Sequence, residues 1–142
     1  MLSLFVVSAM LMGETKVKLE SLPAAVQAAV KEQTKNATLV GLSRETEQGR
    51  TQYEVETSVN GKSRDVTLDK TGAVIEVEEQ VEIDTLPAAA KAAIEKKAAA
   101  GRITKVEKLT AGSAISYEAA ITTKAGKKTR FGVNGDGTPH KD

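Results

Sequence analysis

Five carboxylates between residues 76 and 84 come nearest to a chemical site in this sequence. Oxygen ligands of this kind attract hard cations such as Ca²⁺. A run of acids is also what the polar face of a strand carries, where it protects an edge from association. We predict such a strand face, and no metal site, for the acidic run: Glu76, Glu78, Glu79, Glu82 and Asp84.

Three other motifs share parts of known sites. Gly61-Lys62-Ser63 ends like a phosphate-binding loop, but Glu56 stands where that loop needs its first glycine. The segment 134–137 (Asn-Gly-Asp-Gly) lacks the spaced acidic ligands of a calcium loop, and we expect a turn. His140, the only histidine, lies in a polar tail that we expect to fray. The sequence therefore predicts no catalytic residue, no metal and no cofactor, and the chain is not expected to be an enzyme.

Composition bounds the core and the chemistry. The 142 residues are 40% hydrophobic but only 3% aromatic, so the core must be built from Val, Ile, Leu and Ala. The absence of cysteine excludes disulfides, thiolate metal sites and thiol nucleophiles. This length fits one ordinary domain or two small ones.

Charge is uneven along the chain although the net charge is +1. Residues 14–84 carry 9 Lys and Arg against 14 Asp and Glu, whereas residues 85–142 carry 11 against 5. Opposite halves can attract each other across an interface or in head-to-tail self-association, or the difference is only surface drift between halves. The basic half has few aromatic residues and no basic run, so we expect no nucleic-acid partner.

A repeated unit organises the chain. The segment from Val17 to Ala25 and the segment from Val81 to Ala89 match at a constant offset of 64 residues, including both Leu-Pro-Ala-Ala motifs. The offset becomes 65 after a hairpin that is one residue longer in the second copy. A unit of about 60 residues buries only about 60% of the surface that its unfolded chain exposes and is marginal alone, so we expect the copies to support each other.

Periodicity predicts the same order of elements in both copies. In the first, we expect a strand at 16–20, a helix that starts at Pro23 and stops at Asn36, and strands at 39–47, 51–59, 63–69 and 73–83. In the second, we expect a helix from Pro87 to about Ala99 with Gly101 as its stop, and strands at 103–109, 115–123 and 128–134. Asn60-Gly61 is a strong hairpin signal.

These elements predict an α+β fold. It is a tandem repeat of one helix packed on a mostly antiparallel four-stranded sheet, and the second repeat lacks or shortens its last strand. Alternation of polar and apolar residues in each strand predicts a sheet that is covered on one face and solvated on the other. We place the repeats at residues 14–80 and 81–142.

Residues 1–13 have no counterpart in the second repeat. The stretch from Leu2 to Met12 is apolar and too short to span a bilayer, which matches a remnant of a secretory signal, with Val7-Ser8-Ala9 as a small-residue cleavage site. The alternative is a buried strand. We expect a remnant signal, an exported mature chain and no stable membrane span in it.

The order of these motifs resembles the PepSY-like family, also described as β-lactamase-inhibitor-like. In the first copy the resemblance rests on Leu22-Pro23-Ala24-Ala25, Tyr53-Glu54-Val55, Asn60-Gly61-Lys62 and the turn at 69–72. The second copy departs from it at Ala119 and Ala125. The resemblance implies a periplasmic or secreted bacterial protein without enzymatic activity. It also implies a binding module that inhibits or regulates a peptidase or another envelope or secreted protein; the alternative is a structural or envelope-associated protein with no inhibitory role.

A specific partner should contact what differs between the copies. The largest difference is the first hairpin of each repeat, which is less charged in the second copy. An apolar tip beside a basic residue suits protein contact, or it packs on the first repeat. The candidate partner-binding residues are Lys108, Leu109 and Ile115, with Arg44 and Arg50 in the first copy. Tyr53 and Tyr117 occupy equivalent positions, and we expect them in the core.

Overall fold

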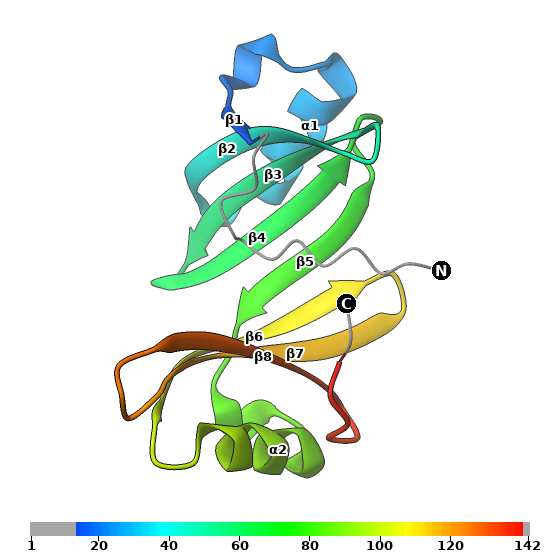
Figure 1. The fold of residues 1–142 in the computed structure, drawn as a ribbon. Coiled ribbons are helices and arrows are strands. Elements are labelled where there is room, and N and C mark those ends of the chain that lie inside the picture. Colours follow the sequence, from blue (N-terminus) through cyan, green and yellow to red (C-terminus); the bar gives the residue numbers. More distant parts are fainter. Residues whose placement is uncertain (1–13, 141–142) are drawn as a thin grey trace. The chain divides into compact units, whose positions relative to one another are not determined.

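Each half of the chain folds as a helix followed by antiparallel strands in the computed structural model of the protein, which describes residues 14–140 (Figure 1). The predicted signal segment, residues 1–13, lies outside the described residues. The first half contains β1 (Thr15–Lys16), α1 (Ala24–Gln33), β2 (Thr38–Glu47), β3 (Arg50–Val59), β4 (Lys62–Asp69) and β5 (Val74–Gln80). The second half contains α2 (Ala88–Ala98), β6 (Arg102–Ala111), β7 (Ala114–Thr122) and β8 (Lys128–Asn134).

The sheet is larger than predicted. Its eight strands are hydrogen-bonded in sequence order, from β1 to β8, rather than forming one four-stranded sheet for each repeat. The α+β class is confirmed, whereas the four-stranded sheet is wrong, because the strands of the two halves join one hydrogen-bonded order. Within the described residues no strand follows β8; only an isolated bridge pairs Val133 with Pro139. The chain divides into two compact units, the first ending at Glu78 and the second beginning at Glu79.

The Leu-Pro pair starts each helix. Pro23 and Pro87 directly precede α1 and α2, and their carbonyls accept hydrogen bonds from Gln27 N and Lys91 N at 2.9 and 3.0 Å. A proline suits this place because its missing N–H and fixed φ cost a helix start nothing. Just before each pair the chain turns in a short 3-10 helix, at Leu19–Ser21 and at Ile83–Thr85.

Two predicted boundaries and one predicted stop residue are wrong for local reasons, whereas the end of the second helix near Ala99 is confirmed. The strand expected at 16–20 ends at Lys16, because Ser21 turns back and donates from its N and its hydroxyl to the Lys18 carbonyl. The first helix ends before Asn36, at Thr34, whose hydroxyl donates to the Val30 carbonyl at 2.9 Å. The second helix is stopped by Ala99 in the left-handed region, φ 47°, two residues before Gly101.

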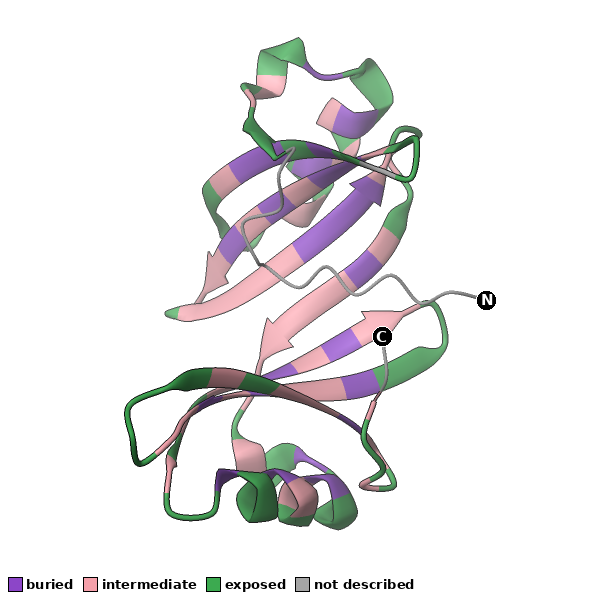
Figure 2. Cartoon of the chain, viewed as in Figure 1, coloured by how far each residue is buried: buried purple, intermediate pink, exposed green. Residues whose placement is uncertain are grey.

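Apolar side chains fill the space between each helix and its strands. Figure 2 shows buried residues on the helix and on the strands of each half. The first core consists of Leu22, Val26, Val30, Leu42, Tyr53, Val55, Val66 and Leu68. The second consists of Leu86, Ala90, Ile94, Ala98, Val106, Ala119, Ile121 and Val133. Tyr53 is buried in the first core, as predicted, and Tyr117 packs partly buried against the second.

The turn after β4, residues 69–72, and the turn after β8, residues 134–137, each press against the start of the helix of their own repeat. A Cβ on Gly72 would lie 2.6 Å from the Ala25 carbonyl oxygen, and one on Gly137 would lie 2.7 Å from that of Ala89. Both glycines have a left-handed backbone, φ 84° and 85°. Glycine is therefore required at each turn both by its φ angle and by the close approach of the helix.

The polar face of the first sheet half is less solvated than predicted. Several polar residues of β2–β5 alternate with the core residues, so they lie on the face opposite α1. Five of them are only 2–7% exposed: Ser43, Glu45, Gln52, Thr67 and Glu76. Alternation therefore predicted the polarity of this face correctly but not its exposure.

Candidate functional site

Ile115 is the one predicted contact residue that is both apolar and well exposed. Its side chain is 48% exposed at the start of β7, where it pairs with Thr110 next to the turn at Gly112. Lys108, two residues from Thr110 on β6, is half-buried and pairs with Tyr117. Alternation puts Lys108 and Ile115 on the same face of the hairpin.

Leu109 does not belong to this surface. It is 4% exposed, so the expectation of an exposed apolar anchor at this residue is wrong. Neighbouring residues on a strand point to opposite faces, so Leu109 also lies on the face away from Lys108 and Ile115. We name Lys108 and Ile115 together the hairpin contact.

Arg44 and Arg50 are both exposed in the first repeat. Arg44 pairs with Tyr53 just as Lys108 pairs with Tyr117, so the two basic residues occupy equivalent places. Arg50 lines a surface hollow beside Asp69 and Thr71. The Asp69 carboxylate is engaged there by its own turn: it accepts hydrogen bonds from the Thr71 hydroxyl and backbone N, which lower its pKa.

The acidic run does not converge on one point. Glu76 is 3% exposed on β5. Asp84 lies beyond the strand and forms an ion pair with Lys91, with 2.6 Å between Asp84 Oδ1 and Lys91 Nζ. The hydrogen bond from Lys91 lowers the pKa of Asp84 and raises that of Lys91. Among the described residues, no group of three carboxylates within metal-ligand distance includes a member of this run.

His140 is held in place rather than frayed. Its backbone N donates to the Gly132 carbonyl at 2.9 Å, and its Nδ1 lies 2.7 Å from the Asn134 side-chain oxygen. The bridge between Val133 and Pro139 brings the tail back along β8 and allows both contacts. The prediction of a frayed terminus is therefore wrong at this residue.

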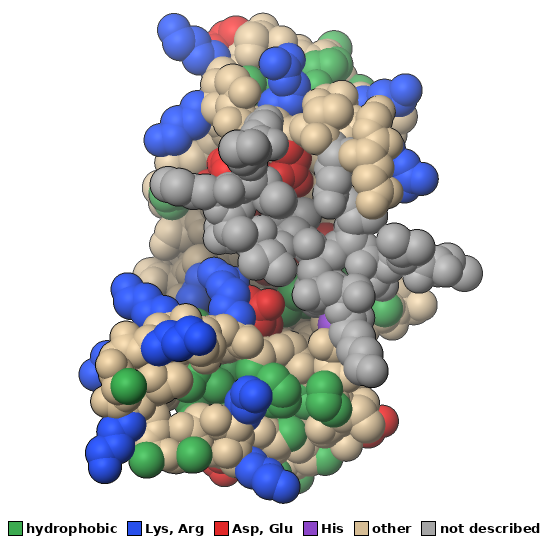
Figure 3. All heavy atoms as spheres, viewed as in Figure 1, with side chains coloured by type: hydrophobic (Ala, Val, Ile, Leu, Met, Phe, Trp, Pro, Cys, Tyr) green, Lys and Arg blue, Asp and Glu red, His purple; other side chains and the backbone are tan. Residues whose placement is uncertain are grey.

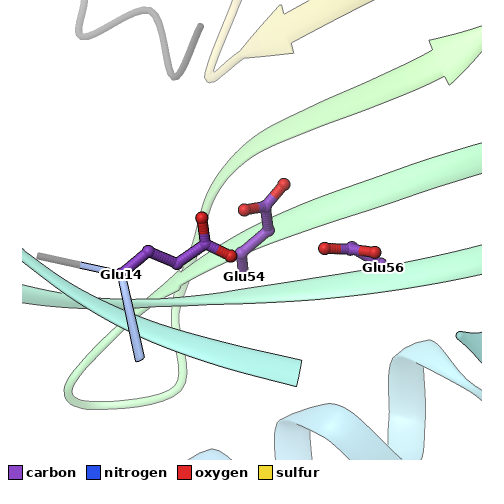
Figure 4. A group of neighbouring side chains, drawn as sticks. All are labelled: Glu14, Glu54 and Glu56. Atoms are coloured by element: carbon purple, nitrogen blue, oxygen red, sulfur yellow. The ribbon is translucent and has the colours of Figure 1, made fainter. Parts of the chain in front are cut away.

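A carboxylate cluster that the sequence analysis missed lies on the polar face of the first repeat. One carboxylate oxygen from each of Glu14, Glu54 and Glu56 lies within 4.8 Å of the other two (Figure 4). Glu54 and Glu56 are half-buried on β3, and Glu14 directly precedes β1. Acidic side chains of the first unit are visible in the space-filling view (Figure 3).

The cluster perturbs the acidity of its central member. Burial raises the pKa of the Glu54 carboxyl from 4.5 to about 7, with further increases from the neighbouring charges of Glu56, Asp65, Glu14 and Glu45. A carboxylate that shares a site with like charges holds its proton more strongly. The alternating Glu54 and Glu56 were visible in the sequence, but Glu14 joins them only through the pairing of β1 with β2, because Thr15 pairs with Arg44.

Comparison with known proteins settles the family. The sequence model of the family described as "Putative beta-lactamase-inhibitor-like, PepSY-like" matches residues 11–76 and 51–135, which together span most of the chain. The chain belongs to the PepSY-like family. The resemblance drawn from the repeated motifs is thus confirmed. None of the curated proteins compared with the chain matches it.

Solved structures share the fold. A "putative periplasmic" protein of Bacteroides eggerthii superposes with a TM-score of 0.68 at 16% identity, over 84% of this chain and 86% of that one. A DUF2874 family protein of Bacteroides uniformis gives 0.66 at 18% identity, with the same coverage. A BLIP-like protein of Bacteroides fragilis gives 0.60 at 19% identity, over 84% of each chain. Neither helix of the described chain is long and apolar enough to cross a membrane.

Proposed function

We propose that this PepSY-like chain is an exported, non-catalytic binding module that inhibits or regulates a peptidase or another envelope or secreted protein. Family membership supports this proposal, because the structural neighbours include proteins described as BLIP-like and as periplasmic. The observation that carries it is the exposure of Ile115 at the tip of the second repeat's hairpin.

Comparison of the repeats shows that only the second copy has an apolar residue at the position of Ile115. At the offset of 64 its counterpart is Thr51, which pairs with Thr46 as Ile115 pairs with Thr110. The fold is therefore built at this position with a polar residue in one copy and an exposed apolar one in the other. Large apolar anchors beside polar residues carry much of the energy of protein interfaces. Lys108 supplies the neighbouring positive charge that orients an acidic partner.

The test begins with affinity capture from the envelope fraction and culture fluid of the native host. A captured protein must then form a stoichiometric complex with the purified chain by size-exclusion chromatography with light scattering. Titration of the complex with wild type and with Ile115→Thr, the residue of the other repeat, measures the contribution of the contact. We expect a loss of affinity of about 5- to 30-fold, the equivalent of about 1–2 kcal/mol.

Val74→Thr is the matched control, since Val74 is 46% exposed in the first unit and makes no part of the hairpin contact. Equal effects of the two substitutions would show that the hairpin has no special role. Inhibition of a captured peptidase by the wild-type chain distinguishes an inhibitor from a binding module of another kind. A failure of any protein to form a stoichiometric complex would favour the structural, envelope-associated role.

A further inference from the structure

The carboxylate cluster of Glu14, Glu54 and Glu56 has the geometry of an oxygen-ligand site. Ca²⁺ takes oxygen ligands at about 2.3–2.6 Å, so two oxygens on one Ca²⁺ lie at most about 5 Å apart. Mg²⁺ binds at about 2.1 Å and limits that separation to about 4 Å. The cluster's oxygens, all within 4.8 Å of one another, therefore fit Ca²⁺. Figure 4 labels the three side chains: Glu54 and Glu56 come from β3, and Glu14 comes from the residue just before β1.

A buried hydroxyl beside the cluster is a second, independent sign of a ligand. Ser43 is 2% exposed, and its Oγ makes no hydrogen bond with any described residue. Ser43 pairs directly with Glu54 across β2 and β3, so both side chains rise from the same face of the sheet. Burial of a polar group without a partner is costly, which is explained if this oxygen has a ligand outside the protein.

A buried amide oxygen extends the same set. Gln52 lies two residues from Glu54 on β3 and therefore on the same face. It is 5% exposed, and its Oε1 also lacks a hydrogen bond among the described residues. Carboxylate, hydroxyl and amide oxygens are all hard donors, the type that Ca²⁺ prefers.

The second repeat shows that the fold does not require this cluster. Glu118, the counterpart of Glu54, forms an ion pair with Arg130, whereas the first repeat has Asp65 at the place of Arg130. Ala120 stands at the place of Glu56. The second copy thus balances its acid with a base, whereas the first copy adds more acids.

The first repeat also makes room for the additional carboxylate. A Cβ on Gly41, which pairs with Glu56, would lie 2.9 Å from Glu56 Oε2. The second repeat has Lys105 at this place, and the Lys105 side chain forms an ion pair with Glu107, the counterpart of Ser43. The glycine and the serine therefore occur together with the cluster, and the two basic residues occur where the cluster is absent.

We propose that the first repeat binds a divalent cation, Ca²⁺, through Glu14, Glu54 and Glu56, with Ser43 and Gln52 as neighbouring oxygen donors. A bound dication offsets the repulsion among the three carboxylates, whose oxygens lie within 4.8 Å of one another. Lys16 stands on the same face, paired with Ser43 on the other side from Glu54, and is exposed enough to turn away. This inference is independent of the proposed partner contact, which lies in the second repeat.

The test is the melting temperature of the full chain at pH 7.5, in chelator and then with 10 mM CaCl₂ or MgCl₂ at matched ionic strength. Open sites of this kind bind Ca²⁺ with Kd of about 0.1–1 mM, so Ca²⁺ should raise Tm by about 4 °C or more and Mg²⁺ by less. Isothermal titration with CaCl₂ should give one site. Equal shifts with both ions, or none with Ca²⁺, would overturn the proposal.

Variants locate the site. Glu54→Gln and Glu56→Gln should each remove the Ca²⁺-dependent rise. In chelator both should be at least as stable as the wild type, because each removes a like charge without changing the shape of the side chain. Glu118→Gln, the equivalent change in the second repeat, should keep the full Ca²⁺ response. A response that survives both Glu54→Gln and Glu56→Gln would place the ion elsewhere and refute the assignment.

Discussion

Alanine at Gly72 or Gly137 should destabilise the protein far more than alanine at an open turn. Two costs add at Gly72. Its φ of 84° lies in the left-handed region, which costs a residue with a Cβ roughly 1–2 kcal/mol. The new Cβ would also lie 2.6 Å from the Ala25 carbonyl oxygen and 3.3 Å from the Ala29 Cβ.

The second cost is hard to relax. The contact is with the backbone of the first turn of α1, so relief requires the turn or the helix to move away from the core. Overpacking of this kind costs about 1–3 kcal/mol. The total, about 2–5 kcal/mol, is a large part of the roughly 5–15 kcal/mol that stabilises an ordinary domain. Gly137, with φ 85° and a 2.7 Å approach to the Ala89 carbonyl, should behave in the same way.

Urea denaturation followed by circular dichroism measures these free energies. Gly61→Ala is the control, because Gly61 has a similar φ of 80° but no atom within 4 Å of the new Cβ. It should lose only the backbone cost of roughly 1–2 kcal/mol. If Gly72→Ala and Gly137→Ala cost no more than Gly61→Ala, the turns do not press on the helices. The close approach of the helix would then not explain the glycine that ends each turn.

Three further predictions concern ionisation, burial and export. In chelator, the free energy of unfolding should fall as the pH rises from 5 to 8. The pKa of Glu54 is raised from 4.5 to about 7 in the folded state, so the folded state keeps a proton that the unfolded state has already lost. Glu54→Gln should remove most of this pH dependence, as measured by urea titrations. Leu109→Ala should lower the free energy of unfolding by about 2–4 kcal/mol, whereas Ile115→Thr should change it by less than about 0.5 kcal/mol. Equal losses of Tm would mean that both side chains are buried. Mass spectrometry of the protein from its native host should find a chain shortened within residues 1–13, and an intact Met1 in cytosolic material would contradict export.

Local signals in the sequence were enough for the repeated elements. The Leu-Pro pairs and the apolar spacing of the helices identify both helices, and Asn60-Gly61 forms its hairpin with both residues at positive φ. Helix ends were less predictable, since the first helix ends at Thr34, which is no typical helix stop, and the second at Ala99, whose positive φ is uncommon for a residue other than glycine. The order of eight strands in one sheet depends on which strands pair, and periodicity within a strand does not encode that pairing.

The candidate sites depended on register. Ile115 and Leu109 both look like apolar residues near a hairpin, and only their opposite faces separate an exposed side chain from a buried one. The carboxylate cluster likewise joins residues 40 positions apart, because β1 pairs with β2 and β2 with β3. A search for acids close in sequence finds the run at 76–84 instead, whose members do not converge.

The two faces of the sheet explain where this fold can change. The core residues face the helices and are closely packed, so substitutions among them disturb packing on several sides. On the opposite face, an acid can exchange with a base or an alanine without touching the helix, as Asp65 and Arg130 or Glu56 and Ala120 show. On this face the first copy gathers Glu14, Glu54 and Glu56, whereas the second has an ion pair between Glu118 and Arg130 at the equivalent place.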